Sequence, residues 1–284
     1  MKKRKGNIGY RFGFYLRACM ITTNPFSLAG RNALVCGSSK GIGRAIAIGM
    51  AAAGANVTLA ARSENELAQT RNMLDTSAGQ VHDFLTVDFS KTLELKELLQ
   101  QRLKTMSYQI LVNNTGGPPA GPLLESHEED FTNAFRNHLL CYHLLAVATI
   151  PGMRASGYGR IVNIISTSVK VPIKGLGVSN TIRAAVANWS KTLSHELAAS
   201  GITVNNVLPG ATKTQRLEEI IRNRAAKTNM TMETVEEEMI HEIPMGRFAT
   251  PDEIAAAAVF LASPAASYIT GINVPVDGGR TGSL

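Results

Sequence analysis

The sequence predicts an α/β fold, in which a doubly wound parallel sheet of about seven strands carries helices on both faces. Short apolar runs alternate with helical stretches from Leu28 onward, and a glycine-rich turn joins the first run to the first helix. The length of 284 residues, with 44% hydrophobic content, allows one such domain to bury a large core. Because ligands of this fold class bind beyond the carboxyl ends of the strands, the loops at those ends form the candidate site.

The strands and helices are expected in alternating order along the chain. The expected strands cover 32–35, 56–60, 81–87, 110–112, 161–165, 202–207 and 272–276. The helices between them cover 45–53, a polar stretch from 64, 91–104, 128–153, 179–199 and 250–262. The last helix has the clearest start, because Thr250 is a good N-cap, Pro251 suits the first helical position and Glu253 completes a capping box.

One stretch, from Gln215 to Met245, interrupts the alternation between the sixth and seventh strands. It is charged and holds four methionines. We interpret residues 215–248 as a mobile substrate lid, and a solvated helical hairpin is an equally good interpretation. Residues 28–284 otherwise form a single domain without internal repeats.

The net charge of +7 is concentrated at the N-terminus. Residues 1–19 hold six basic side chains and no acid, so residues 20–284 carry only +7 − 6 = +1. We interpret residues 1–27 as a basic, disordered extension. Alternatively, residues 1–19 lie upstream of a natural start at Met20. The extension lacks the apolar run of a signal peptide, and no apolar run in the chain reaches the length of a membrane span. With only three, widely spaced cysteines and no secretory signal, we expect a cytoplasmic protein. A basic tail can bind nucleic acid or anionic lipid, but we expect neither partner, because the positive charge is confined to the tail.

The glycine-rich turn after the first strand has the features of a phosphate cradle. Gly37 permits the sharp turn, Gly41 lets a pyrophosphate approach the backbone, and Gly43 lets the helix pack close to the strand. The helix N-terminus then directs free N–H groups and its positive dipole end at the phosphates. Cys36, just before the turn, is expected to be a packed core cysteine.

Four motifs occur in order on the expected elements, and together they span nearly all of the chain from Leu28. In this spacing the chain resembles the short-chain dehydrogenase/reductase family, and in particular the 3-oxoacyl-(acyl-carrier-protein) reductases. The resemblance implies a Rossmann-type oxidoreductase that forms a homodimer or homotetramer through the helices at 128–153 and 179–199. The motifs are Gly37-x-x-x-Gly41-x-Gly43, Asn113-Asn114-x-Gly116, Pro209-Gly210-x-x-x-Thr214 and Asp277-Gly278-Gly279.

The cofactor favoured by these residues is NADP, with NAD second. Arg62 follows the second strand where NAD enzymes carry an acidic residue, and with Lys40 and Ser39 it suits a 2′-phosphate. By resemblance, Asp88 and Phe89 flank the adenine, 114–116 the adenosine ribose and 209–214 the nicotinamide. The expected cofactor residues are Gly37, Ser39, Lys40, Gly41, Ile42, Gly43, Arg62, Asp88, Phe89, Asn114, Thr115, Gly116, Arg183, Pro209, Gly210, Thr212 and Thr214.

The expected catalytic residues depart from the family pattern. By resemblance, Ser166 matches the serine that polarises the carbonyl, and Asn137 matches the asparagine that holds a relay water. The family's tyrosine and its lysine four residues later fall on Ser179 and Arg183, and none of the six tyrosines has a lysine four positions on. Ser179 can also be read as the N-cap of its helix.

Three hypotheses about the chemistry remain open. In the first, Ser166 and Ser179 orient a ketone, an aldehyde or an acyl thioester, while water, Lys170 or Lys174 supplies the proton. In the second, the chain is a catalytically silent NADP-binding protein that acts through partners. In the third, the reaction needs no acid. No metal site is expected, because the zinc-protease histidine spacing is absent.

Overall fold

The computed structural model describes residues 24–283, so the predicted extension lies outside the described residues except for its last four positions. The predicted parallel sheet is confirmed, with seven strands in the order β3-β2-β1-β4-β5-β6-β7. This order reverses direction between β1 and β4, which creates a crevice at the carboxyl ends of these strands. The strands are β1 (Asn32–Cys36), β2 (Asn56–Ala61), β3 (Asp83–Thr86), β4 (Ile110–Asn113), β5 (Gly159–Ile164), β6 (Ile202–Pro209) and β7 (Asn273–Val276).

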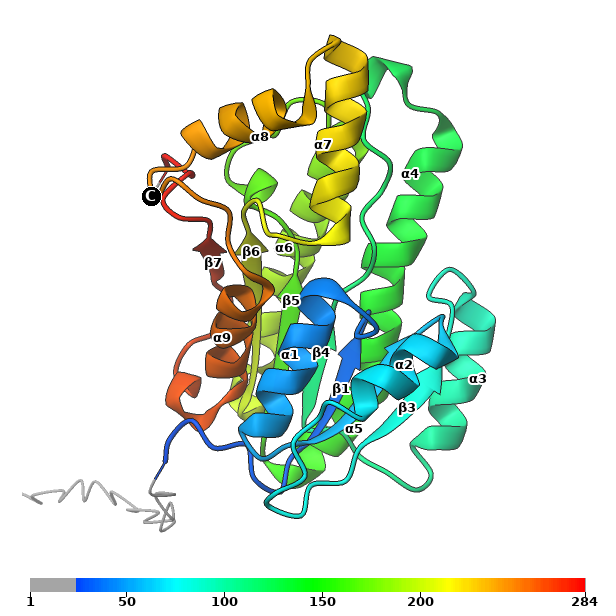
Figure 1. Cartoon of the computed structure of the whole chain (residues 1–284). Coiled ribbons are helices and arrows are strands. Elements are labelled where there is room, and N and C mark those ends of the chain that lie inside the picture. The colour runs from blue at the N-terminus through cyan, green and yellow to red at the C-terminus, as the bar shows by residue number, and fades with distance from the viewer. Residues whose placement is uncertain (1–23, 284) are drawn as a thin grey trace, which may run out of the picture.

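Helices cover both faces of the sheet (Figure 1). On β1, Ala33 and Val35 join the core beneath α1, α2 and α9, whereas Leu34 and Cys36 join the core beneath α3, α5 and α6. This alternation follows from the two-residue period of a strand, and it explains why both faces of the strand are apolar. The helices are α1 (Gly41–Ala52), α2 (Glu64–Arg71), α3 (Thr92–Arg102), α4 (Glu128–Phe135), α5 (Cys141–Ser156), α6 (Gly177–Leu197), α7 (Gln215–Thr228), α8 (Met232–His241) and α9 (Pro251–Ala262).

The prediction of one continuous helix at 128–153 is wrong, because the segment is divided. A π-helical segment, η2 (Arg136–Leu140), separates α4 from α5. A π segment widens the turn by one residue and is often found at functional sites. Here it lies where Asn137 was assigned a role, and it holds His138 in the interior with 1% of its surface exposed.

The start of α6 differs from the interpretation of Ser179 as an N-cap. The helix begins at Gly177 with Leu176 in the N-cap position, so Ser179 lies inside the first turn. Gly177 permits this earlier start, because a Cβ atom there would lie 2.8 Å from the backbone of Leu123. The position of Ser179 is therefore set by close backbone packing and leaves its hydroxyl free of a capping role.

A ladder of asparagines, three of them buried, crosses four neighbouring strands. Asn113, Asn163, Asn206 and Asn273 are direct register partners along β4, β5, β6 and β7. Their side-chain amides hydrogen-bond in sequence, with donor–acceptor distances of 2.8, 3.0 and 2.8 Å. Because buried amides are costly unless they are paired, this ladder stabilises one register of the sheet over its alternatives.

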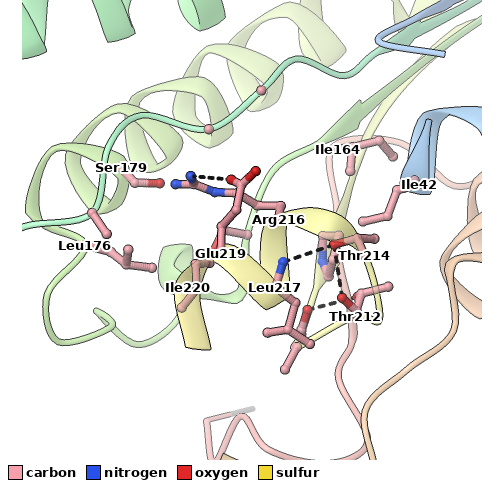
Figure 2. Close-up of a pocket in the computed structure, with 18 of the residues that line it drawn as sticks. Ile42, Ile164, Leu176, Ser179, Thr212, Thr214, Arg216, Leu217, Glu219 and Ile220 are labelled. Atoms are coloured by element: carbon pink, nitrogen blue, oxygen red, sulfur yellow. Dashed lines mark hydrogen bonds and ion pairs between the residues drawn. The ribbon is translucent and has the colours of Figure 1, made fainter. Parts of the chain in front are cut away.

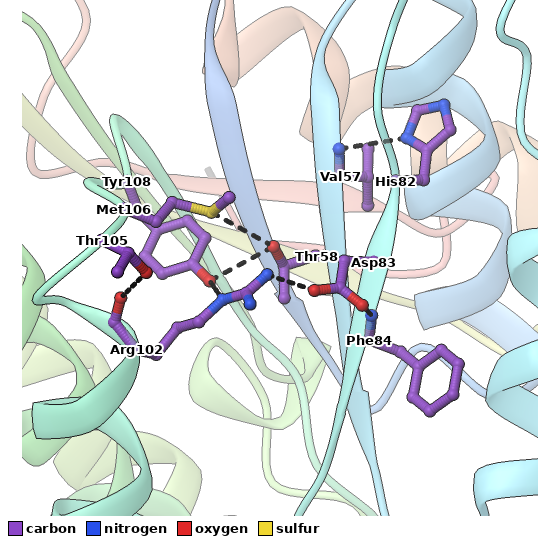
Figure 3. A network of polar contacts seen from close by, with 9 residues as sticks. All are labelled: Val57, Thr58, His82, Asp83, Phe84, Arg102, Thr105, Met106 and Tyr108. Carbon is purple, nitrogen blue, oxygen red and sulfur yellow. Dashed lines mark hydrogen bonds and ion pairs between the residues drawn. The ribbon is translucent and has the colours of Figure 1, made fainter.

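Polar contacts also fix the other edge of the sheet (Figure 3). Arg102 of α3 forms a 2.5 Å ion pair with Asp83 of β3, and its Nε donates to the Tyr108 hydroxyl at 3.3 Å. Tyr108 is fully buried and donates to Thr58 of β2 at 3.2 Å. The network therefore joins α3, β2 and β3. Strand β3 is shorter than the strand expected at 81–87.

The segment between β6 and α9 folds as two helices, α7 and α8, with a small core of their own. Leu217, Ile221 and Val235 are among its buried residues. A parallel bridge between Thr212 and Ala249 closes the base of this segment. The capping box predicted at the start of α9 is confirmed. Among residues 24–283, no helix is both long and apolar enough to cross a bilayer.

Candidate active site

A pocket of about 2130 Å³ opens where the carboxyl ends of the central strands meet α7, the first helix of the segment interpreted as a lid. Loops that follow β1, β2, β4, β5 and β6 all contribute to its wall. Of the residues expected to bind the cofactor or to take part in catalysis as side chains of the site, all but Asp88 and Asn137 line it. Those that do are Gly37, Ser39, Lys40, Gly41, Ile42, Gly43, Arg62, Phe89, Asn114, Thr115, Gly116, Ser166, Ser179, Arg183, Pro209, Gly210, Thr212 and Thr214.

The glycine turn is compact because two glycines allow close backbone contacts. Gly37 has a φ of 60°, in the left-handed region that favours glycine. A Cβ atom on Gly43 would lie 2.1 Å from the Gly37 oxygen and 2.6 Å from the Asn114 amide nitrogen. Gly43 therefore lets α1 pack close to Asn114 and to the turn that directly follows β1. Asn114 in turn donates to the Gly37 oxygen at 3.2 Å.

The N-terminus of α1 meets the requirements for an anion site. Its first turn holds no acidic residue, and the N-cap residue Lys40 makes no capping hydrogen bond. The first-turn N–H groups are therefore left for a ligand, and the helix dipole favours a negative one. Gly116, on the opposite loop, has open space within 4 Å of where a Cβ atom would lie. The residues present thus fit a dinucleotide.

Basic side chains flank the outer part of this cradle. Arg62 is exposed and lines the pocket, and Lys40 donates to Gln215 of the lid at 3.0 Å. Asp88 instead accepts hydrogen bonds from the Ser90 N–H and hydroxyl at 2.9 and 2.8 Å. Burial alone would raise the pKa of Asp88, but the bonds from Ser90 and the Arg62 charge lower it overall. The Asp88 carboxylate therefore stabilises its own loop, whereas Phe89 beside it lines the pocket.

The candidate catalytic side chains come from the end of β5 and the first two turns of α6. Ser166 accepts a hydrogen bond from the Ser168 N–H at 3.1 Å. Arg183 is 7% exposed and donates from Nη1 to the Ile164 oxygen at 2.8 Å, while its buried Nε has no partner. No carboxylate within residues 24–283 pairs with this guanidinium. An unpaired buried cation is costly, which points to a polar ligand at this position.

Asn137 does not reach the pocket surface. Its side-chain oxygen is buried and has no hydrogen-bond partner in the described part of the chain. An orphaned buried acceptor of this kind is where a bound water would be stabilised. Of the two lysines considered as proton donors, Lys174 lines the pocket and Lys170 does not.

Sequence reasoning missed a buried polar cluster behind the pocket wall. The Thr115 hydroxyl lies 2.7 Å from His138 Nδ1 and 3.2 Å from the Tyr142 hydroxyl. Burial, and secondarily the charge of Arg183, holds the pKa of His138 well below its ordinary value, so the imidazole is neutral. The signal in the sequence was the four-residue spacing of His138 and Tyr142, which places both side chains on one face of a helix.

The lid contributes a second set of residues that sequence reasoning did not assign. Arg216, in the first turn of α7, donates from Nη2 to the Pro118 oxygen at 2.8 Å and lies 3.6 Å from the Glu219 carboxylate. Figure 2 shows its guanidinium and the Ser179 side chain directed toward each other across the pocket. The lid therefore places a cation opposite the candidate catalytic serine.

Cysteine and metal chemistry have no support in the described residues. Cys36 is fully buried, as predicted, and burial, with a smaller effect of Cys141, raises the pKa of its thiol well above the ordinary value. Such a thiol stays protonated and behaves as a small apolar side chain. Residues 24–283 also hold no group of three or more histidine, cysteine or acidic side chains placed to share a metal ion.

Comparisons with known proteins agree with this geometry. Residues 37–281 match a family model described as Enoyl-(Acyl carrier protein) reductase. The chain is 33% identical to an uncharacterized oxidoreductase of Mycobacterium tuberculosis, over 90% of this chain and 94% of that protein. It is 32% identical to a 3-oxoacyl-(acyl-carrier-protein) reductase of Vibrio harveyi, over 89% and 98%. The L-sorbose reductase of Gluconobacter frateurii, solved with NADPH and L-sorbose, superposes with a TM-score of 0.85 at 29% identity, over 92% and 100%.

Proposed function

Because the chain belongs to the short-chain dehydrogenase/reductase family, we propose that it uses NADP(H) to reduce a carbonyl group or to oxidise the matching alcohol. The observation that carries this proposal is the meeting of Ser166, Ser179 and Arg183 with the glycine turn in one pocket. Relatives solved with NADPH or NADP support the choice of cofactor.

The chain's own residues would hold the cofactor at three places. The first-turn N–H groups of α1 would bind the pyrophosphate, and Asn114 keeps the turn around them in shape. Arg62 and Lys40 would bind the 2′-phosphate, since both are cations at the pocket rim. The buried Arg183, which lines the pocket, would donate from its guanidinium to hydroxyls of the nicotinamide ribose.

When bound, NADPH supplies the hydride that adds to the carbonyl carbon. Ser166 and Ser179 would donate hydrogen bonds to the carbonyl oxygen, which orients the substrate and stabilises the negative charge that develops there. That oxygen must also gain a proton for the alcohol to form. Ser179 and Arg183 stand in place of the family's tyrosine and lysine. A serine hydroxyl is a far weaker acid than tyrosine, and an arginine stays charged, so solvent in the open pocket would supply the proton.

The substrate candidates are 3-oxoacyl thioesters, simple ketones and aldehydes. The test is to titrate NADPH by fluorescence and then to follow its oxidation with acetoacetyl thioesters and a panel of ketones and aldehydes. We expect saturable NADPH binding and turnover of at least one carbonyl compound. Binding without turnover of every compound would contradict the proposed reaction, and failure to bind NADPH or NADH would contradict the site itself.

A further inference from the structure

The pocket wall beneath the lid is strongly basic. Besides Arg216, the cations along it include Lys174, Lys213 and Lys227, none of which has a carboxylate partner within residues 24–283. Four acids line the pocket. Glu219 is paired with Arg216 and Glu242 with Arg280, whereas Glu66 and Asp252 have no ion-pair partner within residues 24–283. A cavity lined by an excess of one sign concentrates ligands of the opposite sign, so this half of the pocket favours an anion.

Arg216 is the cation best placed to recognise that anion. One side of its guanidinium is held by the Pro118 oxygen at 2.8 Å, which fixes its direction. The other side lies 3.6 Å from Glu219, whereas the lid's neighbouring pair between Arg224 and Glu238 is 2.5 Å long. A loose ion pair leaves room for a second carboxylate to take the fork with better geometry.

Helix stability does not explain an arginine at this position. Arg216 lies in the first turn of α7, where the positive end of the helix dipole disfavours a cation. The helix already has an N-cap, because the Thr214 hydroxyl accepts from the Leu217 N–H. The dipole and the guanidinium instead add their positive potentials on the side of the pocket that Ser179 faces (Figure 2).

Apolar side chains lie next to this charge. Leu176, from the loop before α6, and Ile220, from α7, both line the pocket, on the sides that carry Ser179 and Arg216 respectively (Figure 2). They offer a surface for an aliphatic group but no hydrogen bonds. A ligand that fits all of these features has a carboxylate at one end, an apolar group, and a carbonyl between the cation and the serine.

On these grounds, and resting on the proposed function, we infer that the substrate is an oxo acid whose carboxylate binds Arg216. The carboxylate accepts from the N–H groups of Arg216 that the Pro118 oxygen does not occupy and displaces Glu219, while the carbonyl oxygen turns to Ser179. The lid thereby selects for a negatively charged substrate. A neutral ketone cannot displace Glu219, so the Arg216 guanidinium keeps its long ion pair with that carboxylate. Arg216 is a specificity-determining residue in this arrangement.

The test measures binding separately from turnover. Equilibrium dialysis with saturating NADP⁺ compares 4-methyl-2-oxopentanoate with its methyl ester, on wild type and on Arg216→Gln. We expect wild type to bind the acid at least 10-fold more tightly than the ester, and Arg216→Gln to weaken acid binding roughly 100-fold while leaving the ester unchanged. Arg222→Gln is the matched control, since it removes the same charge from an exposed position of the same helix that does not line the pocket. Equal affinities for acid and ester, or equal effects of the two variants, would overturn the inference.

A parallel assay of NADPH oxidation separates this inference from the proposed function. Turnover of the neutral ester as efficient as that of the acid, unaffected by Arg216→Gln, would overturn the inference and leave the proposed reaction standing. Arg216-dependent binding of the acid without oxidation of NADPH by any carbonyl compound would overturn the proposed reaction and leave the binding role of Arg216 standing. Glu219→Gln is expected to bind the acid at least as tightly as wild type, because the competing carboxylate is gone; weaker binding would count against displacement.

Discussion

The buried imidazole of His138 makes the stability of the fold depend on pH in a calculable way. Its pKa is held well below the ordinary value near 6.5, first by burial and then by the charge of Arg183. The folded protein therefore keeps the ring neutral in a range where the unfolded chain takes up a proton. Stability is fully present above pH 6.5 and is lost as the pH falls below it, because the unfolded state binds the extra proton.

The size of this effect follows from one proton. Each pH unit between the two pKa values costs about 1.4 kcal/mol, so one proton can remove at most about 2 kcal/mol of the free energy of unfolding when the pH falls from 6.5 to 5.0. His138→Gln abolishes the titration but retains an amide that can bond to the Thr115 hydroxyl. The variant should therefore lose less stability than wild type over the same pH change, by up to about 2 kcal/mol.

The assay is urea unfolding of wild type and His138→Gln at pH 7.0 and pH 5.0, followed by circular dichroism. The comparison that matters is the difference between the two pH values, so a general loss of stability in the variant does not affect it. His143→Gln is the control, because His143 is exposed on the next helix. The reasoning is refuted if wild type and His138→Gln lose equal free energies of unfolding between pH 7.0 and pH 5.0. It is also refuted if His143→Gln reduces this loss as much as His138→Gln does.

Four further predictions concern the cofactor, the catalytic residues and the sheet. Arg62→Gln should weaken NADPH binding roughly 10-fold in a fluorescence titration and leave NADH binding unchanged; a parallel loss for both would exclude a 2′-phosphate contact. Ser179→Tyr combined with Arg183→Lys should raise kcat for a ketone by about 100-fold in a spectrophotometric assay, and no gain would show that proton donation is not limiting. Gly43→Ala should abolish NADPH binding, because its Cβ would lie 2.1 Å from a backbone oxygen, so retained affinity would contradict the described turn. Asn163→Ala should cost about 2–4 kcal/mol in denaturant unfolding, since it strands buried amides; a cost near zero would show that the ladder is not stabilising.

The cofactor half of the site could be predicted from the sequence because its determinants are local. A turn such as Gly37 to Gly43 needs glycine at fixed spacings, and those spacings are visible in the chain itself. Arg62 could be placed because it follows a clear apolar strand. The alternation of strands and helices likewise fixed the parallel sheet, since sequential strands of this kind join by crossovers.

The substrate half could not be predicted because it depends on contacts between distant segments. The carbonyl group that holds Arg216 belongs to Pro118, 98 residues away. The burial of His138 depends on a π-helical segment, which has no periodicity that a sequence pattern reveals. Gly177 starts α6 early only because the backbone of Leu123 lies against it. In each case tertiary packing decided a feature that local preference leaves open.

The asparagine ladder has a consequence for the site as well as for the sheet. Asn114, Ser166 and Gly210 lie just beyond the ends of their strands. They follow the ladder members of those strands by one, three and four residues, respectively. A shift of one residue between two strands would raise one loop relative to its neighbours by about 3.3 Å. Because the amides pair only in register, the ladder fixes the relative positions of the loops that form the base of the pocket. Substrate orientation at Ser166 is thus set partly by side chains that never touch the substrate.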